Sequence, residues 1–205
     1  METGPDFREE HALKDGTRVV LRHIRADDAT ELRRGLARLS PQSRYRRFLG
    51  VVNGLSEEQL RYLTRPDGHD HLAIVAVAPR PEGEEGLGVA RFVRIPGEPT
   101  VAEAAITVID EAQGKGLGLL LSLALARAAH ERGIQRFRGQ IVADNAAVRE
   151  LLADAGASLG KPDGDRMTFD VDIAPTPFAP GTGLDRVARR LLRAAADALV
   201  SVLPR

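Results

Sequence analysis

The fold is decided by one stretch, Ala104–Gly133, which reads AAITVIDEAQGKGLGLLLSLALARAAHERG. Its first residues are apolar and rich in β-branched side chains, which predicts a buried strand. The Ala/Leu-rich part predicts a helix from about Gly116 to Arg132, because a glycine follows it. Between the two lie Gly114, Gly116 and Gly118, although one glycine is enough for a turn from strand to helix.

This spacing of glycines is typical of a loop that binds phosphate. Successive backbone N–H groups in such a loop point inward and bind anions. The N-terminus of the next helix adds unpaired N–H groups and the positive end of the helix dipole. The sequence therefore predicts a pyrophosphate site at Gly114–Gly118, and the alternative is a tight turn without a ligand.

Two common nucleotide loops do not fit this stretch. A Walker loop ends in Gly-Lys-Ser/Thr, whereas Lys115 precedes Gly116 and no hydroxyl residue follows it. A Rossmann turn has the order GxGxxG and an acidic residue about 20 positions further on. Here the order is GxGxG, and the residue roughly 20 positions beyond Gly118 is Arg138.

The pattern Q-x-x-G-x-G, formed by Gln113, Gly116 and Gly118, resembles the signature of the GCN5-related N-acetyltransferases, the GNAT family. The apolar triplet Ile106–Val108 before the loop and an asparagine, Asn145, at the start of the next helix are similar to further marks of that family. The order of elements matches from about residue 17 to 173. The segment LSPQSRYRRF resembles more narrowly the acetyltransferase domain of bacterial protein-lysine acetyltransferases.

The resemblance implies an α/β protein with the GNAT fold, a mixed and mostly antiparallel central sheet flanked by helices, and a C-terminal helical appendage. We expect a flexible N-terminal tail over residues 1–15 and the N-acetyltransferase domain over 16–173. A Pro/Gly-rich linker over 174–183 leads to an amphipathic helix over 184–205. That helix is expected to dock on its own domain or to form a homodimer, and the alternative is contact with a membrane surface.

Local patterns outside the opening stretch place the other elements. Alternation and β-branched residues predict strands, and Ser56 with Gln59 forms a capping-box pattern at the start of a helix. The segment PRPEGEEG predicts a turn at residues 79–86. The predicted strands are 17–25, 72–78, 87–95, 101–109, 137–143 and 166–173, and the predicted helices are 26–39, 40–50, one from 56, 116–132 and 145–156.

The resemblance also implies that acetyl-CoA is the acyl donor. The backbone from Gln113 to Gly118, with Gly114, Lys115, Gly116 and Leu117 between them, would hold the pyrophosphate. The backbone of Ile106 and Val108 would pair with the pantetheine arm like an added strand, and the Asn145 side chain would reach the cofactor. The alternative for Lys115 is an ordinary exposed loop lysine.

Acyl transfer to an amine needs a base, because a lysine-type amine is mostly protonated at neutral pH. Glu103 is our candidate, since it is the only charged residue in VAEAAITVI and apolar neighbours raise the pKa of a carboxylate. The narrower family resemblance implies a glutamate at this point. The alternative is that Glu103 lies at the open end of the strand and faces water.

Two aromatic positions bear on the rest of the site. Many members of the family have a tyrosine as general acid seven residues after the asparagine, and Leu152 stands there in this sequence. Tyr45 lies in the early helical region that borders the acceptor site in such proteins, so it is a candidate for substrate binding. The alternative is that Tyr45 packs its own helix.

These residues support two functions of different classes. The first is an N-acetyltransferase that acts on a primary amine, of a protein lysine or a small molecule, by direct attack in a ternary complex. The second is a non-catalytic acyl-CoA-binding module, which the leucine at position 152 favours. Only the first predicts release of CoA when an amine acceptor is present.

Composition excludes several other classes. The formal net charge is zero, which argues against nucleic acid as a partner, and there is no cysteine for a disulfide or a thiolate site. No apolar run reaches the ~20 residues that span a bilayer, and the polar N-terminus lacks a signal-peptide pattern. We therefore expect a cytoplasmic protein without integral membrane association. His69 and His71 have no third ligand nearby, so no metal site is predicted.

Overall fold

The structure is a computed structural model of the chain, and it describes residues 3–48, 52, 54–144, 146, 149, 152 and 157–173. Asn145, the linker 174–183 and the C-terminal segment 184–205 lie outside the described residues. Within the described residues, one eight-stranded sheet runs in the order β1-β2-β3-β4-β5-β6-β8-β7. The pair β5–β6 is parallel and every other neighbouring pair is antiparallel. The strands are β1 Arg8–Ala12, β2 Arg18–His23, β3 His71–Arg80, β4 Gly83–Ile95, β5 Glu98–Val108, β6 Arg136–Val142, β7 Ser158–Asp163 and β8 Arg166–Asp172.

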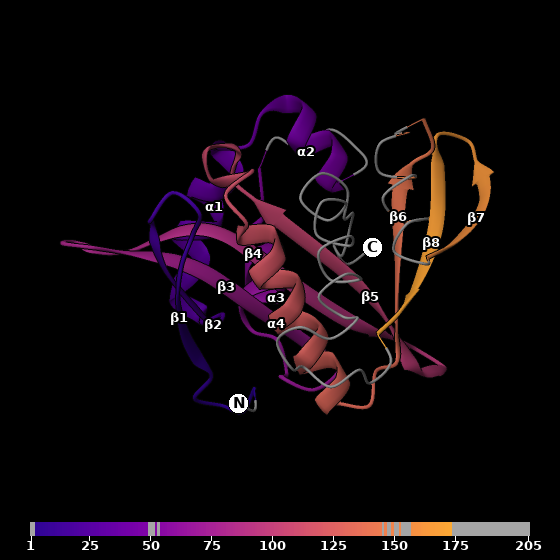
Figure 1. Cartoon of the computed structure of the whole chain (residues 1–205), viewed down its shortest axis with the longest axis horizontal. Helices are drawn as coiled ribbons and strands as arrows, with labels where there is room; N and C mark the ends of the chain where they lie inside the picture. Colours follow the sequence, from indigo (N-terminus) through magenta and orange to yellow (C-terminus); the bar gives the residue numbers. More distant parts are fainter. Residues whose placement is uncertain are drawn as a thin grey trace.

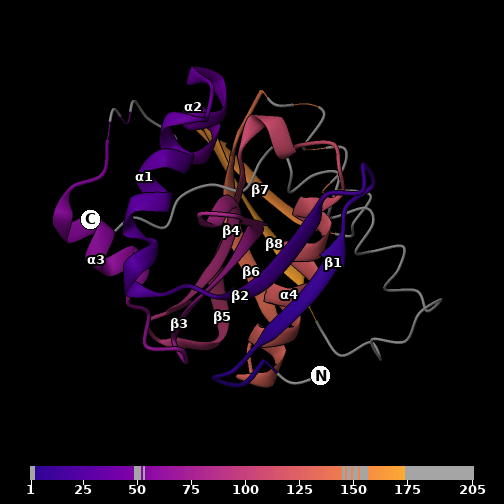
Figure 2. The ribbon, with the colours of Figure 1, turned by 90° about the vertical axis from the view of Figure 1, so that its left-hand side faces the viewer.

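Helices cover both faces of this sheet (Figure 2). On one face lie the short helices between β2 and β3, and on the other lies the long helix that follows β5, as the sequence predicts. The helices are η1 Ala26–Asp28, α1 Ala29–Ala37, α2 Pro41–Phe48, α3 Glu57–Thr64, η2 Asp110–Ala112 and α4 Leu117–Glu131.

Local sequence patterns explain where these helices begin. The Ser56 side chain accepts from the Gln59 amide at 3.1 Å, and the Gln59 side chain accepts from the Ser56 amide at 2.9 Å. This reciprocal pair confirms the predicted capping box. At α2, the Ser43 amide donates to Ser40 Oγ at 3.1 Å, as expected for a serine before a proline at the first helical position.

The core is divided by the sheet into unequal parts. The largest cluster lies between α4 and the sheet and contains Leu72, Phe92, Leu121 and Leu125, all fully buried. A smaller cluster on the other face contains Ile24, Val75 and Val77 from β3 and the segment after β2. The half of the sheet beyond β6 has a cluster of its own, formed by Ile141, Leu152, Met167, Phe169 and Val171.

The predicted flexible tail is wrong for its central part. Arg8–Ala12 form strand β1, which pairs in register with β2 from Arg8↔Arg22 to Ala12↔Arg18. The strand is polar on both faces, so its sequence carries no apolar alternation. Its anchors lie just outside it, where Phe7 and Leu13 are buried. Pairing with β2, the next strand in the chain, and the burial of Phe7 and Leu13 therefore decide this strand.

Two further differences concern strand lengths and an extra strand. The predicted turn at 79–86 is mostly strand, because β3 continues to Arg80 and β4 begins at Gly83. The pairing of β3 with β4 continues to the end of the hairpin, through Pro79↔Glu84 and Arg80↔Gly83. Ser158–Asp163, which the sequence analysis left unassigned, forms β7 at the edge of the sheet. No helix among the described residues is long and apolar enough to cross a membrane.

Candidate functional site

Strands β5 and β6 meet for a short distance and then separate. They pair only at Val101↔Arg136, Ala102↔Phe137 and Glu103↔Arg138. Strand β5 stays paired with β4 as far as Val108, while β6 continues beside β8 to Val142. Figure 1 shows the two strands diverging beyond their short contact. The edge of β5 after Glu103 therefore lacks a strand neighbour among the described residues.

The register of β5 shows which backbone groups face this open edge. The Ile109 amide donates to the Leu87 carbonyl at 3.0 Å, so Ile109 faces β4. Residues of an antiparallel pair alternate between bonding to the partner and pointing away from it. Ile106 and Val108 therefore direct their N–H and C=O groups away from β4, toward β6. The Val108 carbonyl accepts from Gln113 Nε2 at 3.1 Å, in agreement with this orientation.

The glycine loop joins this edge to the N-terminus of α4. Gly114 and Gly116 have φ angles of +72° and +91°, a region that favours glycine. Gly116 is the N-cap of α4, and no side chain caps the helix there. Gly118 belongs to the first turn of α4 and is buried. Two of the three glycines are thus required by the backbone, and the uncapped N–H groups of the first turn are available to an anion.

Two lysines border the loop in different ways. Lys115 Nζ lies 2.9 Å from the Asp15 carboxylate, and this hydrogen bond holds the Asp15 pKa well below its ordinary value. The Lys14 amide donates to the Lys115 carbonyl at 3.1 Å. A Cβ built on Gly116 would lie 3.8 Å from Lys14 Cε, so the Lys14 side chain runs past the helix N-terminus. No sequence pattern indicates this role of Lys14, because it lies in the polar residues 1–15, which were expected to form a tail.

Glu103 lies where the two strands part, and its side chain is exposed. Ala102 and Ala104 on either side of it are buried toward α4, so Glu103 faces the side of helices α1–α3. The expectation of a carboxylate enclosed by apolar neighbours is wrong for this side chain, which is exposed as the alternative proposed, because the strand turns it away from the cluster under α4. It remains close to Tyr62, whose pKa is raised mainly by burial and further by the charge of Glu103.

The structure brings Tyr45 to the far half of the sheet. Its hydroxyl donates to Asp165 Oδ2 at 2.9 Å, and this bond raises its pKa. Asp165 precedes β8, and its carbonyl accepts from the Ala143 amide at 2.8 Å at the end of β6. The Tyr45 side chain is 40% exposed, so it does not pack into its helix. It links α2 to the end of β6 instead.

Leu152 is buried in the cluster of β6 and β8, with Met167 and Phe169. An apolar side chain in this position supplies no proton, so position 152 offers no general acid. His69 and His71, which are two residues apart in the sequence, lie in different surroundings. His69 Nδ1 bonds to Asp70 at 2.7 Å on the surface, whereas His71 is buried against the ring of Tyr62.

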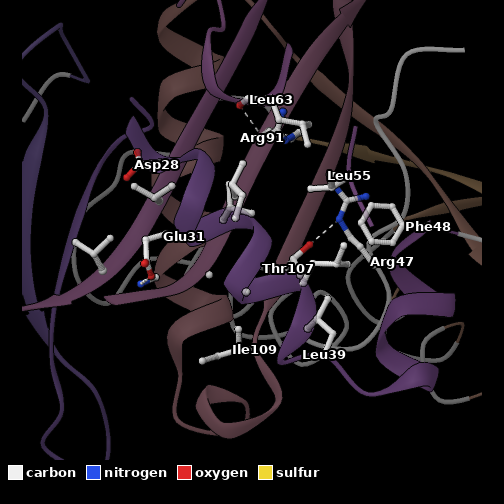
Figure 3. Close-up of a pocket in the computed structure, with 18 residues that line it drawn as sticks. Asp28, Glu31, Leu39, Arg47, Phe48, Leu55, Leu63, Arg91, Thr107 and Ile109 are labelled. Carbon is white, nitrogen blue, oxygen red and sulfur yellow. Dashed lines mark hydrogen bonds between the residues drawn. The ribbon is translucent and has the colours of Figure 1, made fainter. Parts of the chain in front are cut away.

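A cavity of about 80 Å³ lies between helices α1–α3 and the sheet (Figure 3). Its walls are mostly apolar, and β5 contributes Thr107. Two arginines that the sequence analysis did not single out also line it, Arg47 from α2 and Arg91 from β4. The sequence could not single out Arg47 and Arg91 as cavity residues, because arginine is common in this chain. Of its 29 lysines and arginines, 26 are arginine.

The hydrogen-bond partners of both arginines are uncharged acceptors. Arg47 Nε donates to Thr107 Oγ1 at 2.5 Å. Arg91 donates through Nη2 to the Leu63 carbonyl at 3.1 Å and contacts His71 Nε2 through Nη1 at 3.1 Å. Burial lowers the pKa of Arg47 to about 10 and that of Arg91 to about 9, the second with a further contribution from the charge of Arg47.

Comparison with known proteins agrees with this geometry. A family model described as an acetyltransferase (GNAT) domain matches residues 18–158. Acetyltransferase Pat of Mycolicibacterium smegmatis is 33% identical over 190 residues, which cover 89% of this chain and 55% of that protein. Acetyltransferase PA5475 of Pseudomonas aeruginosa is 31% identical over 157 residues, which cover 77% of this chain and 83% of that protein.

Among solved structures, the GNAT domain of S. lividans PAT has a TM-score of 0.70 and 26% identity, and the match covers 80% of this chain and 96% of that one. The chain spans about half the length of the M. smegmatis protein, 55% of it. The parted strands, the glycine-capped helix and these matches lead to one conclusion: the chain belongs to the GNAT acetyltransferase family.

Proposed function

We propose that the chain is an N-acetyltransferase that transfers an acetyl group from acetyl-CoA to a primary amine. The observation that carries this proposal is the unpaired edge of β5 running into the uncapped N-terminus of α4. The first offers backbone partners to an extended amide chain, and the second offers N–H groups to a pyrophosphate. Pantetheine and pyrophosphate follow each other in CoA in the same order.

The residues present fit this donor. Ile106 and Val108 would bond to the pantetheine arm, and the amides from Gln113 to Gly118 would hold the phosphates. Lys115 and Lys14 add positive charge beside the same helix end. Asn145, which lies outside the described residues, remains a proposed contact from the family resemblance. When bound, acetyl-CoA supplies a thioester, whose carbonyl carbon is open to attack by an amine.

Glu103 is the proposed base. The acceptor must lose a proton as its nitrogen bonds to the thioester carbon and the carbon–sulfur bond breaks. Glu103 faces the side of the sheet opposite α4 and lies at the point where β5 and β6 part. An exposed carboxylate there takes this proton through water. A backbone N–H of β5 would stabilise the oxyanion, and solvent would protonate the departing CoA thiolate, because position 152 holds a buried leucine.

The first test is thermal unfolding with and without acetyl-CoA, with NAD and ATP as controls. A ligand at ~100-fold its dissociation constant stabilises the folded state by roughly 2.7 kcal/mol. For a chain of this size the midpoint then rises by roughly 5–10 °C. A rise with acetyl-CoA and none with the controls supports the donor site. No rise with any of the three ligands contradicts it.

The second test separates catalysis from binding. Glu103→Gln is expected to reduce kcat by about 10²-fold while the acetyl-CoA midpoint shift stays as in the wild type. Glu58→Gln is the matched control, since Glu58 is an exposed carboxylate on α3 outside the parted strands. A kcat within a few-fold of wild type across pH 6–9 would rule out Glu103 as the base.

The alternative is a non-catalytic acyl-CoA-binding module, and the buried Leu152 is the observation that favours it. Both functions predict the midpoint shift with acetyl-CoA. Release of free CoA over a panel of amines distinguishes them, because only the enzyme releases CoA faster when an acceptor is added.

A further inference from the structure

The cavity beneath helices α1–α3 contains two buried cations that have no counter-anion among the residues that the structure describes. Arg47 and Arg91 are only 7% and 1% exposed. Arg47 Nη1 and Arg91 Nε are fully buried and have no hydrogen-bond partner among the described residues. Taking a charged group out of water is costly unless it is paired. Two such groups on one cavity wall therefore indicate a missing anion.

The carboxylates nearest to this cavity are already engaged. Asp28 lines it, yet its two oxygens bond to Arg22 at 2.7 and 2.8 Å. Glu31 also lines it, and its oxygens bond to Arg34 at 2.6 Å and to the Gly86 amide at 3.0 Å. No ion pair within the described part of the chain involves Arg47 or Arg91. The described residues therefore offer no free carboxylate to the two cations, and an anion supplied by a ligand would compensate them.

The two cations lie on the same face of the sheet as the proposed base. Arg91 is the direct partner of Ala105, two residues along β5 from Glu103. Thr107, which accepts from Arg47, is two residues further along the same strand. With a rise of about 3.4 Å per residue, these positions lie roughly 7 and 14 Å from Glu103 along the strand. Tyr62 lies close to both Arg91 and Glu103, since the charges of both residues affect its pKa.

Resting on the acyl transfer proposed above, we propose that the acceptor is a small amine that carries its own carboxylate. The carboxylate binds to Arg47 and Arg91 inside the cavity, and the amine points along β5 toward Glu103. The spacing favours an amine and a carboxylate separated by several methylene groups, as in an ω-amino acid. The apolar walls of Leu36, Leu39, Leu63 and Val89 suit such a methylene chain.

The size of the cavity agrees with this class of acceptor. About 80 Å³ exceeds the roughly 10–15 Å³ that one water needs, and it is far smaller than the pocket of a drug-sized ligand. It accommodates the carboxylate end of a small molecule. A lysine side chain on a folded protein brings no carboxylate into the cavity and leaves both cations unpaired.

The first arm of the test compares acceptors of equal length by CoA release. 6-Aminohexanoate, 4-aminobutyrate and 3-aminopropionate are each set against the alkylamine with the same number of carbons, and 6-aminohexanoate also against its neutral amide. We expect kcat/KM at least tenfold higher for the carboxylate, mainly through KM. Equal kcat/KM for carboxylate and alkylamine overturns the proposal, as does a lysine peptide that outcompetes every amino acid.

The second arm measures binding without any chemistry. Hexanoate, with hexanol as the neutral control, is titrated into the free protein and followed by calorimetry and by the unfolding midpoint. Hexanoate is expected to bind to the wild type and to Arg44→Met, whose guanidinium bonds to the Leu39 and Ala37 carbonyls. Binding is expected to weaken at least tenfold in Arg47→Met and Arg91→Met and to recover in part in Arg91→Lys.

The two arms separate this proposal from the proposed function. Hexanoate binding that depends on Arg47 and Arg91, without CoA release for any amine, leaves the carboxylate site standing and refutes the enzyme. CoA release with neutral amines and no hexanoate binding at tens of millimolar leaves the enzyme standing and refutes the carboxylate site. The wild-type measurements decide both points even where a variant fails to fold.

Discussion

The protein buries arginine in two regions that differ in how the charge is compensated. Arg22 on β2 bonds to both oxygens of Asp28 at 2.7 and 2.8 Å and to Glu84 at 2.7 and 2.9 Å. Burial by itself would lower the Arg22 pKa, but the bonds to Asp28 and Glu84 outweigh it and raise the pKa. Arg47 on α2 has one side-chain bond, and burial lowers its pKa.

The comparison separates a stabilising arginine from one that awaits a ligand. At Arg22 the protein supplies the anion, so the charge fixes β2 against the start of α1. At Arg47 and Arg91 the described part of the chain supplies neutral acceptors only, which leaves part of the desolvation cost without compensation. Binding sites often carry such a stability cost. Substitutions at Arg22 and Arg47 should therefore change the free energy of unfolding by different amounts.

The largest effect is expected at the paired arginine. Arg22→Met leaves Asp28 buried without its cation, and we expect it to lower the free energy of unfolding by about 3 kcal/mol. The midpoint of thermal unfolding then falls by roughly 6–12 °C. Arg22→Met combined with Asp28→Leu should recover part of the loss. A single variant as stable as the wild type would remove the distinction between the two regions.

The next effect is a loss of stability at acidic pH through His71. Its Nε2 accepts from Arg91, and burial and then the Arg91 charge lower its pKa from 6.5 to about 4. Between these values the unfolded chain binds a proton that the folded protein does not. Stability is therefore complete above pH 6.5 and falls as the pH drops toward 4, by about 2 kcal/mol after allowing for partial solvation.

Urea unfolding at pH 7.5 and pH 4.5 measures this contribution as a difference between proteins. His71→Gln should lose less stability than the wild type over the same interval, and the exposed His69→Gln should behave like the wild type. An identical pH dependence in all three proteins would show that His71 does not report on the charge of Arg91.

At Arg47 we expect a smaller effect on the free energy of unfolding, either close to zero or stabilising. Arg47→Met gives up one hydrogen bond to Thr107, worth about 1 kcal/mol, and removes a buried charge that lacks an anion. We expect the free energy of unfolding to stay within about 1 kcal/mol of the wild type or to rise. Chemical denaturation of the ligand-free protein measures it. A loss as large as that of Arg22→Met would mean that the guanidinium is structural.

The smallest effect is expected at the exposed pair of Lys115 and Asp15. Both side chains are 37% exposed, and such pairs contribute little to stability. Lys115→Ala should leave the unfolding midpoint unchanged within error and raise the acetyl-CoA dissociation constant a few-fold, less at high salt because ions screen the charge. A large drop in the midpoint would place this surface pair in the same class as Arg22.

Local patterns predicted the backbone elements that form the proposed donor site. The strand, the turn and the helix of residues 104–133 form as β5, η2 and α4, because apolar β-branched residues, glycines and helix formers act over short distances. The sequence left open whether Glu103 is enclosed by apolar neighbours or faces water, and the structure exposes it, because the face of a strand that meets the core depends on what packs against it. Strand β1 was missed, since its pairing with β2 is not written in an apolar pattern.

The sequence by itself determined the family, the loop that begins α4 and the elements on either side of it. Those features follow from backbone requirements and from periodicities of two and 3.6 residues, which neighbours in the chain settle. Only the tertiary structure decided that β5 and β6 part after Glu103 and that Arg22 has anions while Arg47 and Arg91 have none among the described residues. Charge compensation depends on groups up to 62 residues apart, Arg22 and Glu84, and no local pattern records such distances.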